Sequence, residues 1–436
     1  MAPQLFGTDG VRVVAGDLLT AELAVALGRA ATAECEAQRP QVLLIRDTRE
    51  SGPMLESALA AGIAAAGGDA LIGGVLPTPA ASVLVRRLGL DRAAVISASH
   101  NPWRDNGIKF FGADGRKLRP AAEARIEAVA SETAPAGGEI GRVRALEGGL
   151  DDYLRELERK FPLDLSGRRV VLDCANGATH RAAPAIFTRL GADVVTIGDE
   201  PDGRNINEGC GSTHPEELAE RVVAESASIG FAFDGDGDRL IAVDSAGQVR
   251  DGDEAIALIA THLDGAGRLP GGVAVTVMSN YGFHQAMDEA GIEIATTAVG
   301  DRHVSAELER RDWSLGGEQS GHLIWTEFAP TGDGIAAALL LLAALGDRDL
   351  AATRPMERLP QVLVNVEVAD RDAVEGATAV WEAIEREGAG LEGRGRILER
   401  PSGTEPLVRV MVEAPSAEEA QAVCDRLVGV VRDELT

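Results

Sequence analysis

The sequence predicts an α/β protein with three similar mixed α/β sandwich domains and a smaller α+β domain at the C-terminal end. Two observations support this prediction. Apolar, β-branched runs alternate with alanine-rich amphipathic segments until about residue 357, where the pattern changes. Apolar residues also make up 45% of the 436 residues, enough to bury several cores. Strand–helix–strand alternation indicates parallel strands in sheets that helices cover on both faces.

The alternation locates the individual elements. Buried strands are expected at residues 42–45, 93–96, 170–172, 194–197, 229–233 and 273–277. Amphipathic helices are expected at 54–66, 181–190 and 301–310. The apolar stretch 335–345 predicts a core helix, because it has about half of the ~20 residues that a membrane span needs. The C-terminal part predicts strands at 361–368, 394–398 and 408–412 and helices at 374–387 and 417–435.

Breaks in this pattern near residues 150, 251–253 and 355–360 divide the chain into four predicted domains. Each predicted domain contains one polar loop that is a candidate site. The predicted domains are residues 1–150, 151–250, 251–357 and 358–436, and their polar loops lie at 97–109, 233–239, 316–322 and 400–409.

Charge and cysteine content narrow the class of protein. Lys and Arg total 42 against 69 Asp and Glu, a net charge of −27, which disfavours non-specific binding to nucleic acid or to an acidic membrane surface. An anionic substrate would therefore need a local group of arginines and lysines. The N-terminus has neither a basic start nor an apolar run, so no secretory signal is expected. The four cysteines form no CxxC pair, which favours reduced thiols in a cytoplasmic protein.

The first polar loop contains Ser99 and follows the strand predicted at 93–96. Open α/β sheets bind ligands at the carboxyl ends of their strands. Ser99 is a candidate nucleophile beside a candidate base, His100, although a polar turn without chemistry explains the loop equally well. The chain has only three lysines, and Lys109 and Lys117 both lie within eighteen residues of Ser99. Because the chain otherwise uses arginine, this favours a role for a titratable ammonium near Ser99.

The second polar loop contains three aspartates, Asp234, Asp236 and Asp238, which alternate with glycines directly after a predicted strand. Carboxylates so close together repel one another unless a cation neutralises them, and hard divalent cations prefer oxygen ligands. The EF-hand pattern fails, because its sixth position is Arg239 rather than Gly and its twelfth is Ser245 rather than Glu. The loop therefore predicts a Mg²⁺ site, with Arg239 placed to contact a phosphate or to orient the carboxylates.

The third and fourth loops carry groups that suit a sugar phosphate. Glu318, Ser320 and His322 offer donors and acceptors for sugar hydroxyls or an amine, although a tight turn fits this pattern at least as well. The fourth loop has a Ser-Gly-Thr turn flanked by arginines, which favours phosphate binding, and its candidate residues are Arg400, Ser402, Gly403, Thr404 and Arg409. No Gly-Lys dipeptide occurs, so a Walker phosphate loop is excluded. Together the four loops predict phosphoryl transfer.

At these four loops, and at residues 6–12 (FGTDGVR), the chain resembles the α-D-phosphohexomutase superfamily. The resemblance spans almost the whole chain, because four separate motifs occur in the family's order and spacing. It implies four domains around a central cleft, of which the first three share an α/β core and the last is α+β. It also implies that the phosphate passes through a phosphoserine on the enzyme.

The resemblance implies roles for individual residues. Ser99 matches the family's phosphoserine, and the residues that would hold one Mg²⁺ per site are Ser99, Asp234, Asp236 and Asp238. The residues that match the groups around the transferring phosphate are Arg12, His100, Lys109, as the general acid or base, and Arg239. The sugar loop is matched by Glu318, Ser320 and His322, and the loop for the non-reacting phosphate by Arg400, Ser402, Gly403, Thr404 and Arg409. Val13 stands where the family usually has Gly, so the first loop is expected to differ in shape.

Two details favour the branch of the superfamily that acts on glucosamine phosphates. They are Gln319 in the sugar loop, and Asp301 where relatives acting on glucose or mannose commonly place His. A carboxylate at 301 would pair with an ammonium on C2 of the sugar. The resemblance implies reversible conversion of glucosamine 6-phosphate to glucosamine 1-phosphate for UDP-N-acetylglucosamine synthesis, with glucosamine 1,6-bisphosphate as the priming intermediate. A homodimer is compatible with the sequence, and no nucleic-acid or membrane partner is expected.

Three other functions stay open from the sequence alone. Within the superfamily, the alternative is a phosphomannomutase or phosphoglucomutase. A Mg²⁺-dependent sugar phosphatase would use the same hydroxyl and metal but release the phosphate to water. A sugar-phosphate sensor would keep the fold without turnover, which the intact set of Ser99, Lys109 and three aspartates disfavours.

Overall fold

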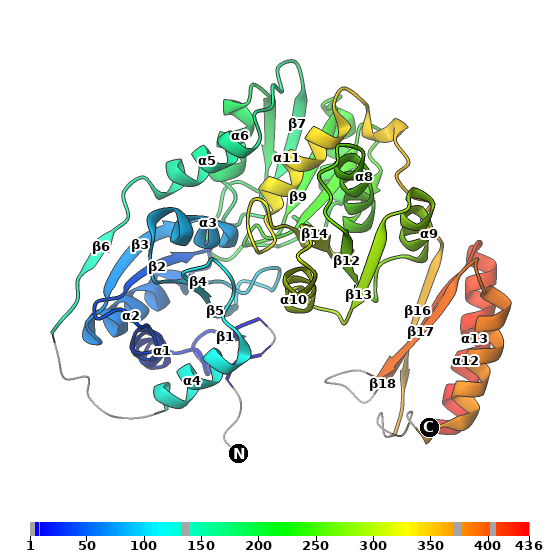
Figure 1. Ribbon diagram of the computed structural model, residues 1–436, viewed down its shortest axis with the longest axis horizontal. Helices are drawn as coiled ribbons and strands as arrows, with labels where there is room; N and C mark the ends of the chain where they lie inside the picture. Colours follow the sequence, from blue (N-terminus) through cyan, green and yellow to red (C-terminus); the bar gives the residue numbers. More distant parts are fainter. Residues whose placement is uncertain are drawn as a thin grey trace. The chain divides into compact units, whose positions relative to one another are not determined.

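The computed structural model describes residues 5–7, 9–131, 139–369, 373, 376–401 and 407–435. It divides into two compact units, Met1–Met278 with Ile292–Pro355 and Ser279–Gly291 with Met356–Thr436. Each unit has its own hydrophobic core. Along the chain, the first unit forms three mixed sheets and the second forms one antiparallel sheet (Figure 1).

The first sheet has the strand order β1-β5-β4-β2-β3-β6. Its strands are β1 Val11–Val14, β2 Gln41–Arg46, β3 Asp69–Val75, β4 Arg92–Ile96, β5 Asp105–Gly112 and β6 Val143–Ala145, and its helices are α1 Ala21–Ala33, α2 Gly52–Ala65, α3 Thr78–Leu88 and α4 Pro120–Ala130. In Figure 1, α1, α2 and α4 lie on one face of this sheet and α3 on the other. Helices on both faces explain why β4 is buried along its whole length.

The second sheet has the order β11-β10-β9-β7-β8. Its strands are β7 Arg169–Asp173, β8 Asp193–Ile197, β9 Ile229–Phe233, β10 Leu240–Asp244 and β11 Val249–Arg250, and the helices of this part are α5 Gly149–Lys160, α6 Ala182–Arg189 and α7 Glu216–Ala224. Alternate residues of β9 face opposite sides. Phe231 packs on Phe187 of α6, whereas Ala232 joins the core under Leu218 and Val222 of α7.

The third sheet has the order β13-β12-β14-β15. Its strands are β12 Gly272–Thr276, β13 Glu293–Thr297, β14 Leu315–Gly317 and β15 Leu323–Trp325, and the helices of this part are α8 Gly252–Gly265, α10 Asp301–Arg311, α11 Gly334–Leu345 and the short 3₁₀ helix η1 Leu350–Ala352. Val304 and Leu308 of α10 pack against Ala274 of β12. Helix α11 is buried on nearly all sides, as expected for the apolar stretch 335–345.

The three sheets share a feature that strand–helix alternation did not predict. The expectation of parallel strands is confirmed for the pairs β2–β3, β2–β4, β7–β8, β7–β9, β12–β13 and β12–β14. It is wrong for the pairs β4–β5, β9–β10 and β14–β15, which are antiparallel. Antiparallel neighbours can be joined by short loops. Each of the first three polar loops joins one of these antiparallel pairs.

The second unit is a three-stranded antiparallel sheet with helices packed on it. Its strands, in the order β16-β18-β17, are β16 Gln361–Glu367, β17 Arg396–Pro401 and β18 Leu407–Glu413, and its helices are α9 Tyr281–Ala290, α12 Thr378–Leu391 and α13 Ala417–Leu435. The helix expected at 374–387 begins at Thr378, and Val374 lies outside the described residues. Glu413 is fully buried and accepts hydrogen bonds from Arg396 Nε (2.7 Å) and Tyr281 N (2.8 Å), which ties α9 to the sheet.

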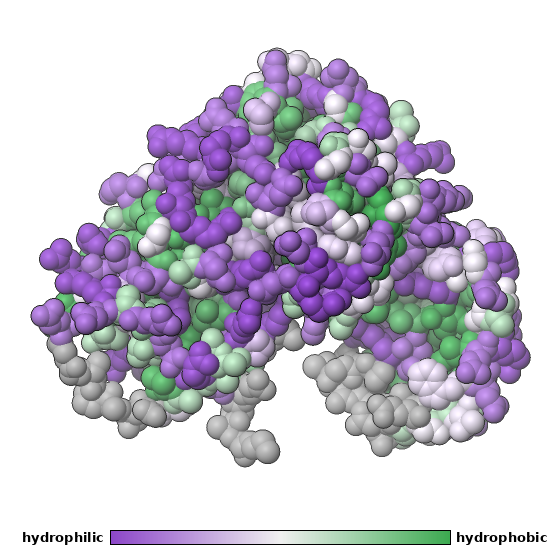
Figure 2. All heavy atoms as spheres, viewed as in Figure 1, coloured by the Kyte–Doolittle hydropathy of each residue, from purple (hydrophilic) through white to green (hydrophobic). Residues whose placement is uncertain are grey.

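The surface in view is largely polar. Figure 2 shows hydrophilic side chains over most of this face, with hydrophobic ones gathered in smaller areas between them. Exposed large apolar side chains, such as Leu18, Ile140 and Val223, come from separate parts of the chain. Every helix in the described residues is too short or too polar to cross a bilayer.

A buried carboxyl connects α5 to the start of α11. Asp333 is 3% exposed and caps α11 by accepting a hydrogen bond from Ala336 N (2.9 Å). Tyr153 of α5 donates its hydroxyl to the same carboxyl, at 2.9 and 3.0 Å from the two oxygens. Burial outweighs these hydrogen bonds and raises the pKa of Asp333 to about 7.

This pKa predicts a stability change with pH. Between the ordinary carboxyl pKa near 4 and the folded value near 7, the folded state holds a proton that the unfolded state has lost, so stability falls as pH rises by about 1 kcal/mol per pH unit. Asp333→Asn keeps an acceptor for Ala336 N and cannot ionise. The melting temperature of the variant relative to wild type should therefore rise between about pH 5 and pH 8. A difference that stays constant over this range would contradict the prediction.

Candidate active site

Ser99 lies just beyond β4 with its hydroxyl against the second polar loop. It is 3% exposed and adopts a left-handed backbone conformation, with φ of 52°. Its Oγ donates a hydrogen bond to Asp234 Oδ2 at 2.5 Å, whereas His100 Nδ1 is farther away at 3.4 Å. The predicted nucleophile and the predicted metal loop therefore meet in the folded chain, although 135 residues separate them.

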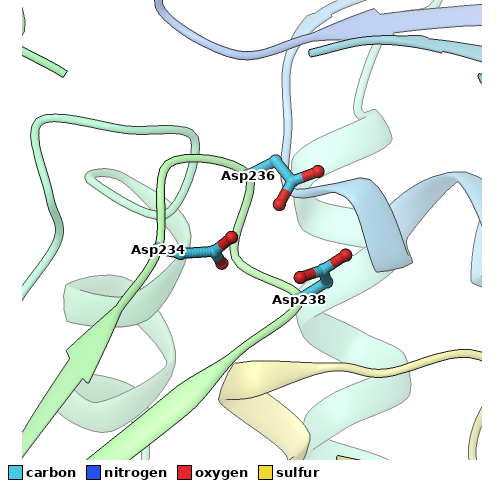
Figure 3. A group of neighbouring side chains, drawn as sticks. All are labelled: Asp234, Asp236 and Asp238. Atoms are coloured by element: carbon cyan, nitrogen blue, oxygen red, sulfur yellow. The ribbon is translucent and has the colours of Figure 1, made fainter. Parts of the chain in front are cut away.

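The three aspartates of the β9–β10 connection converge on one point (Figure 3). One carboxylate oxygen from each of Asp234, Asp236 and Asp238 lies within 4.8 Å of the others, and all three residues are buried. Among the described residues, Asp236 Oδ1 and Asp238 Oδ1 are buried without a hydrogen-bond partner. Buried carboxylate oxygens without donors fit a divalent cation, so this cluster is able to hold a metal ion.

Glycine at position 235 allows the two loops to touch. A Cβ placed on Gly235 would lie 2.6 Å from the carbonyl oxygen of Ser99, closer than atoms of a side chain can approach. The loop is also held from the first sheet, because Thr78 donates its hydroxyl to Asp236 Oδ2 at 2.7 Å. The alternation of Asp and Gly thus allows the carboxylates to converge and the two loops to make close backbone contact.

The carboxylates of the cluster differ in their affinity for protons. Burial raises the pKa of Asp234 well above its usual range, and the neighbouring charges of Asp236 and Asp238 raise it further. Burial acts in the same sense on Asp236, but Lys109 and the Thr78 hydroxyl outweigh it and lower the pKa. Lys109 thus pairs directly with Asp236, whereas Arg239 does not offset the burial of Asp234, so a bound cation would add most at Asp234.

A chain of charged side chains runs from this cluster to the start of α10. Lys109, 2% exposed, lies 3.0 Å from both Asp236 Oδ2 and Asp9 Oδ2. Asp9 also accepts from Lys117 at 2.6 Å, and Lys117 reaches Asp301 Oδ2 at 2.5 Å. Lys109 and Asp301 are predicted site residues, whereas Asp9 and Lys117 are not among those predicted from the sequence. The scarcity of lysine was the signal for Lys117, and Asp9 lies inside the FGTDGVR motif.

Two guanidinium groups and a histidine complete the surroundings of Ser99. Arg12 donates to Asp9 Oδ2 (2.5 Å) and to Asn101 Oδ1 (3.4 Å), and the backbone N–H of Arg239 donates to Asp234 Oδ1 (3.1 Å). The Nε atoms of both arginines are buried without an acceptor among the described residues. Burial, with help from these two arginines, lowers the pKa of His100 to about 4. The two arginines can therefore donate hydrogen bonds to an anion.

The position that raised a question, Val13, is ordinary strand. It pairs with Asn106 in the β1–β5 ladder and is absent from the described residues with positive φ. A β-branched residue suits an extended backbone. Val13 is therefore unstrained, and a difference in shape between the first loop and that of the family stays a prediction.

The third polar loop lies beside the aspartate cluster. His322 Nδ1 is 3.4 Å from Asp238 Oδ1, and its Nε2 is 3.6 Å from Asp301 Oδ2. Burial opposes protonation of His322, but these two carboxylates outweigh it and raise the pKa to about 9. Glu318 accepts a hydrogen bond from Gly300 N (2.9 Å), which fixes the turn before Asp301. Ser320 is exposed on the loop.

The fourth polar loop belongs to the second unit. Arg400 and Arg409 are directly opposite each other in the β17–β18 ladder. Ser402, Gly403 and Thr404 lie outside the described residues. The site in the first unit therefore brings Ser99, Lys109 and His322 into contact with the three aspartates, whereas Ser320 is exposed on its loop. The fourth loop is described only by its two arginines.

Four family models match the chain in sequence order. They are the phosphoglucomutase/phosphomannomutase α/β/α domain I at residues 3–136, domain II at 151–247, domain III at 251–362 and the C-terminal domain at 363–430. A phosphoglucosamine mutase of Desulforudis audaxviator is 51% identical over 98% of both chains. The chain belongs to the phosphoglucomutase/phosphomannomutase family. This confirms the family resemblance, the fold class and the assignment as a phosphohexomutase-type enzyme.

Other family members agree with this placement. A phosphoglucosamine mutase of Pelotomaculum thermopropionicum is 50% identical over 98% of this chain and 99% of its own. The crystal structure of a phosphoglucomutase/phosphomannomutase family protein from Burkholderia thailandensis has a TM-score of 0.85 at 26% identity, covering 99% of this chain and 97% of its own. The N-acetylphosphoglucosamine mutase of Aspergillus fumigatus, solved with GlcNAc-6P and magnesium, has a TM-score of 0.68 at 20% identity, covering 99% and 96%.

The aspartate cluster predicts one divalent-cation site in this family member. With Mn²⁺ as a spectroscopic probe, wild type should bind one ion, and Asp238→Asn should weaken binding by about tenfold or more, because ligand charge sets cation affinity. Asp264→Asn removes an exposed carboxylate elsewhere and serves as the matched control. Equal Mn²⁺ affinity in Asp238→Asn and wild type would show that the cluster is not the site.

Proposed function

We propose that the chain is a phosphoglucosamine mutase, which interconverts glucosamine 6-phosphate and glucosamine 1-phosphate. The single observation that carries this proposal is the contact of Ser99 Oγ with the aspartate cluster, at 2.5 Å from Asp234. Identity of about half over the full length with relatives of that name supports the same activity. The product would supply amino-sugar nucleotide synthesis in the cytoplasm.

In this proposal Ser99 carries the phosphate between the two ends of the sugar. O1 of glucosamine 6-phosphate attacks the phosphorus on Ser99, the bond from phosphorus to Oγ breaks, and O1 loses a proton while Oγ gains one. The resulting 1,6-bisphosphate turns over, Oγ attacks the phosphorus on O6 and gives up its proton, and O6 leaves with a proton. Mg²⁺ held by Asp234, Asp236 and Asp238 would neutralise charge on the phosphoryl oxygens. A variant of the Aspergillus enzyme has been solved with glucose 1,6-bisphosphate, a molecule of the same type.

The other groups bind and orient the phosphate. Arg12 and Arg239 offer guanidinium N–H groups that no described residue accepts. Lys109 lies between Asp236 and Asp9, and its ammonium would exchange a proton with the reacting oxygen. Arg400, Ser402, Gly403, Thr404 and Arg409 would hold the phosphate that is not reacting, in either orientation of the sugar.

The sugar-selecting groups are Asp301, Glu318, Ser320 and His322. Asp301 would face the ammonium on C2, with Lys117 and His322 beside its Oδ2. Gln319, which favoured this branch, donates its amide to Asp251 (3.2 Å) at the start of α8 and thus helps to hold the sugar loop. A phosphomannomutase or phosphoglucomutase stays the alternative within the family.

Replacement of the nucleophile tests the phosphoserine cycle. Ser99→Ala should lose essentially all turnover and still bind the sugar phosphate, because only the atom that accepts the phosphate is removed. Intact-mass analysis of wild type should show one phosphate, on the peptide that contains Ser99. Near-normal turnover in Ser99→Ala would overturn the mechanism, and phosphate release equal to substrate loss in wild type would identify a phosphatase instead.

Replacement of Asp301 tests the choice of sugar. Wild type should have a higher kcat/KM for glucosamine 6-phosphate than for the glucose and mannose phosphates. Asp301→Asn should reduce this preference by about tenfold, the usual effect of losing a hydrogen bond to a charged group. Glu309→Gln on the same helix, whose carboxylate pairs with exposed Arg119, is the control. A wild type that prefers glucose 1-phosphate would reassign the chain to another branch.

A further inference from the structure

Arg49 is a fully buried arginine that contacts the backbone of the Ser99 loop. It follows β2, and its side chain is 0% exposed. Its two terminal nitrogens donate to four backbone carbonyls of the loop. They are the carbonyls of Ser99 (2.8 Å), Asn101 (2.8 Å), Asp105 (2.9 Å) and Pro102.

The remaining N–H of this guanidinium pairs with a buried carboxylate. Arg49 Nε donates to Asp47 Oδ2 at 2.8 Å, and Asp47 is also fully buried. An arginine side chain has five N–H donors, so every donor of Arg49 is used. Asp47 balances its charge. Arg49 therefore differs from Arg12 and Arg239, whose Nε atoms have no acceptor among the described residues, and it has nothing left to offer a phosphate.

The same carboxylate also reaches the amide side of Ser99. Ser97 donates its hydroxyl to Asp47 Oδ2 (2.6 Å) and accepts the backbone N–H of Ser99 (2.9 Å). The backbone of Ser99 is thus fixed on both sides, at its carbonyl through Arg49 and at its N–H through Ser97 and Asp47.

A second donor reaches the loop from the other side. Asn207, which precedes the second sheet's β9 in the chain, donates its side-chain amide to Ser99 O (2.9 Å) and Asn101 O (3.1 Å). The carbonyl of Ser99 therefore accepts from both Arg49 and Asn207. These contacts explain how a non-glycine residue keeps the left-handed backbone of Ser99, a conformation that persists only where the surroundings hold it.

We propose that Arg49 is a positioning residue for phosphoryl transfer, which fixes Ser99 Oγ at the aspartate cluster through the backbone of its loop. The inference rests on the proposed function. Transfer in both directions needs Oγ, with or without its phosphate, at one place relative to the cluster, and displacement of a reacting atom by about 1 Å can cost about 100-fold in rate. Lysine cannot replace Arg49, because three donors on one atom cannot span four carbonyls and a carboxylate.

The test follows transfer of a labelled phosphate from Ser99 to glucosamine 6-phosphate in a single turnover. Arg49→Met should slow this transfer by about 100-fold and leave the KM for the sugar phosphate within about threefold, because Arg49 does not touch the substrate. The transfer rate of Arg49→Lys should lie between those of wild type and Arg49→Met. The control is Arg92→Met, which removes another buried arginine of the first sheet. Arg92 begins β4 and donates to Ala31 O (2.6 Å), whereas Ser99 follows the end of that strand.

The outcomes separate the two proposals. Transfer by Arg49→Met within about threefold of wild type, or an equal loss in Arg92→Met, would overturn the positioning role. A wild type that transfers its phosphate to no hexose phosphate would overturn the proposed function instead. If Arg49→Met does not fold, Asn207→Ala decides, because it removes only one donor from Ser99 O. It should slow transfer by about tenfold, and an unchanged rate would overturn the role.

Discussion

Three carboxylates buried side by side at the β9–β10 connection are the constraint that organises the rest of the site. Ionised groups removed from water need partners of opposite charge, and an unmet need is costly. The chain supplies Lys109 to Asp236 and the hydroxyls of Ser99 and Thr78, and it places Arg239 next to the cluster. Asp236 Oδ1 still has no described donor, and Asp238 Oδ1 has only the His322 ring nitrogen, at 3.4 Å. A bound cation would therefore stabilise the buried cluster. The Ser99 hydroxyl is one of the groups that contact it.

The same kind of connection between strands positions these groups in all three sheets of the first unit. A parallel strand returns through a helix, whereas an antiparallel neighbour needs only a short loop. In each sheet of the first unit, one antiparallel pair provides such a loop, and these loops carry Ser99, the aspartates and His322. The loops contact one another directly: Ser99 bonds to Asp234, and His322 lies beside Asp238. Short connections leave little freedom, which suits groups that must meet within hydrogen-bond distance.

The sequence alone could reveal those parts of the site in which the chemically important residues are close together along the chain. Ser99 and the aspartates stand directly after apolar strands, so both their type and their place in the fold were predictable. Arg49 was not, because its role is to bind backbone carbonyls, which leave no mark on the residue types around it. Lys117 and Asp301 are 184 residues apart, and only the packed chain shows that they meet. Antiparallel directions were missed for a similar reason, and the four domain boundaries stay predictions.

The pair formed by Lys117 and Asp301 bears on how an amino sugar would be chosen. Lys117 and the nearby His322 outweigh burial and lower the pKa of Asp301 to about 2, so this carboxylate is charged before substrate arrives. A substrate ammonium would then share Asp301 with a buried lysine. Removing one partner from a buried ion pair is normally costly, because the other charge is left alone. Here Lys117 also pairs with Asp9 at 2.6 Å, so it would retain one carboxylate partner if Asp301 paired with another cation. Asp9 would thus allow Asp301 to exchange one ammonium for another, and would connect sugar selection to the chain of charged side chains that ends at Lys109 and the aspartate cluster.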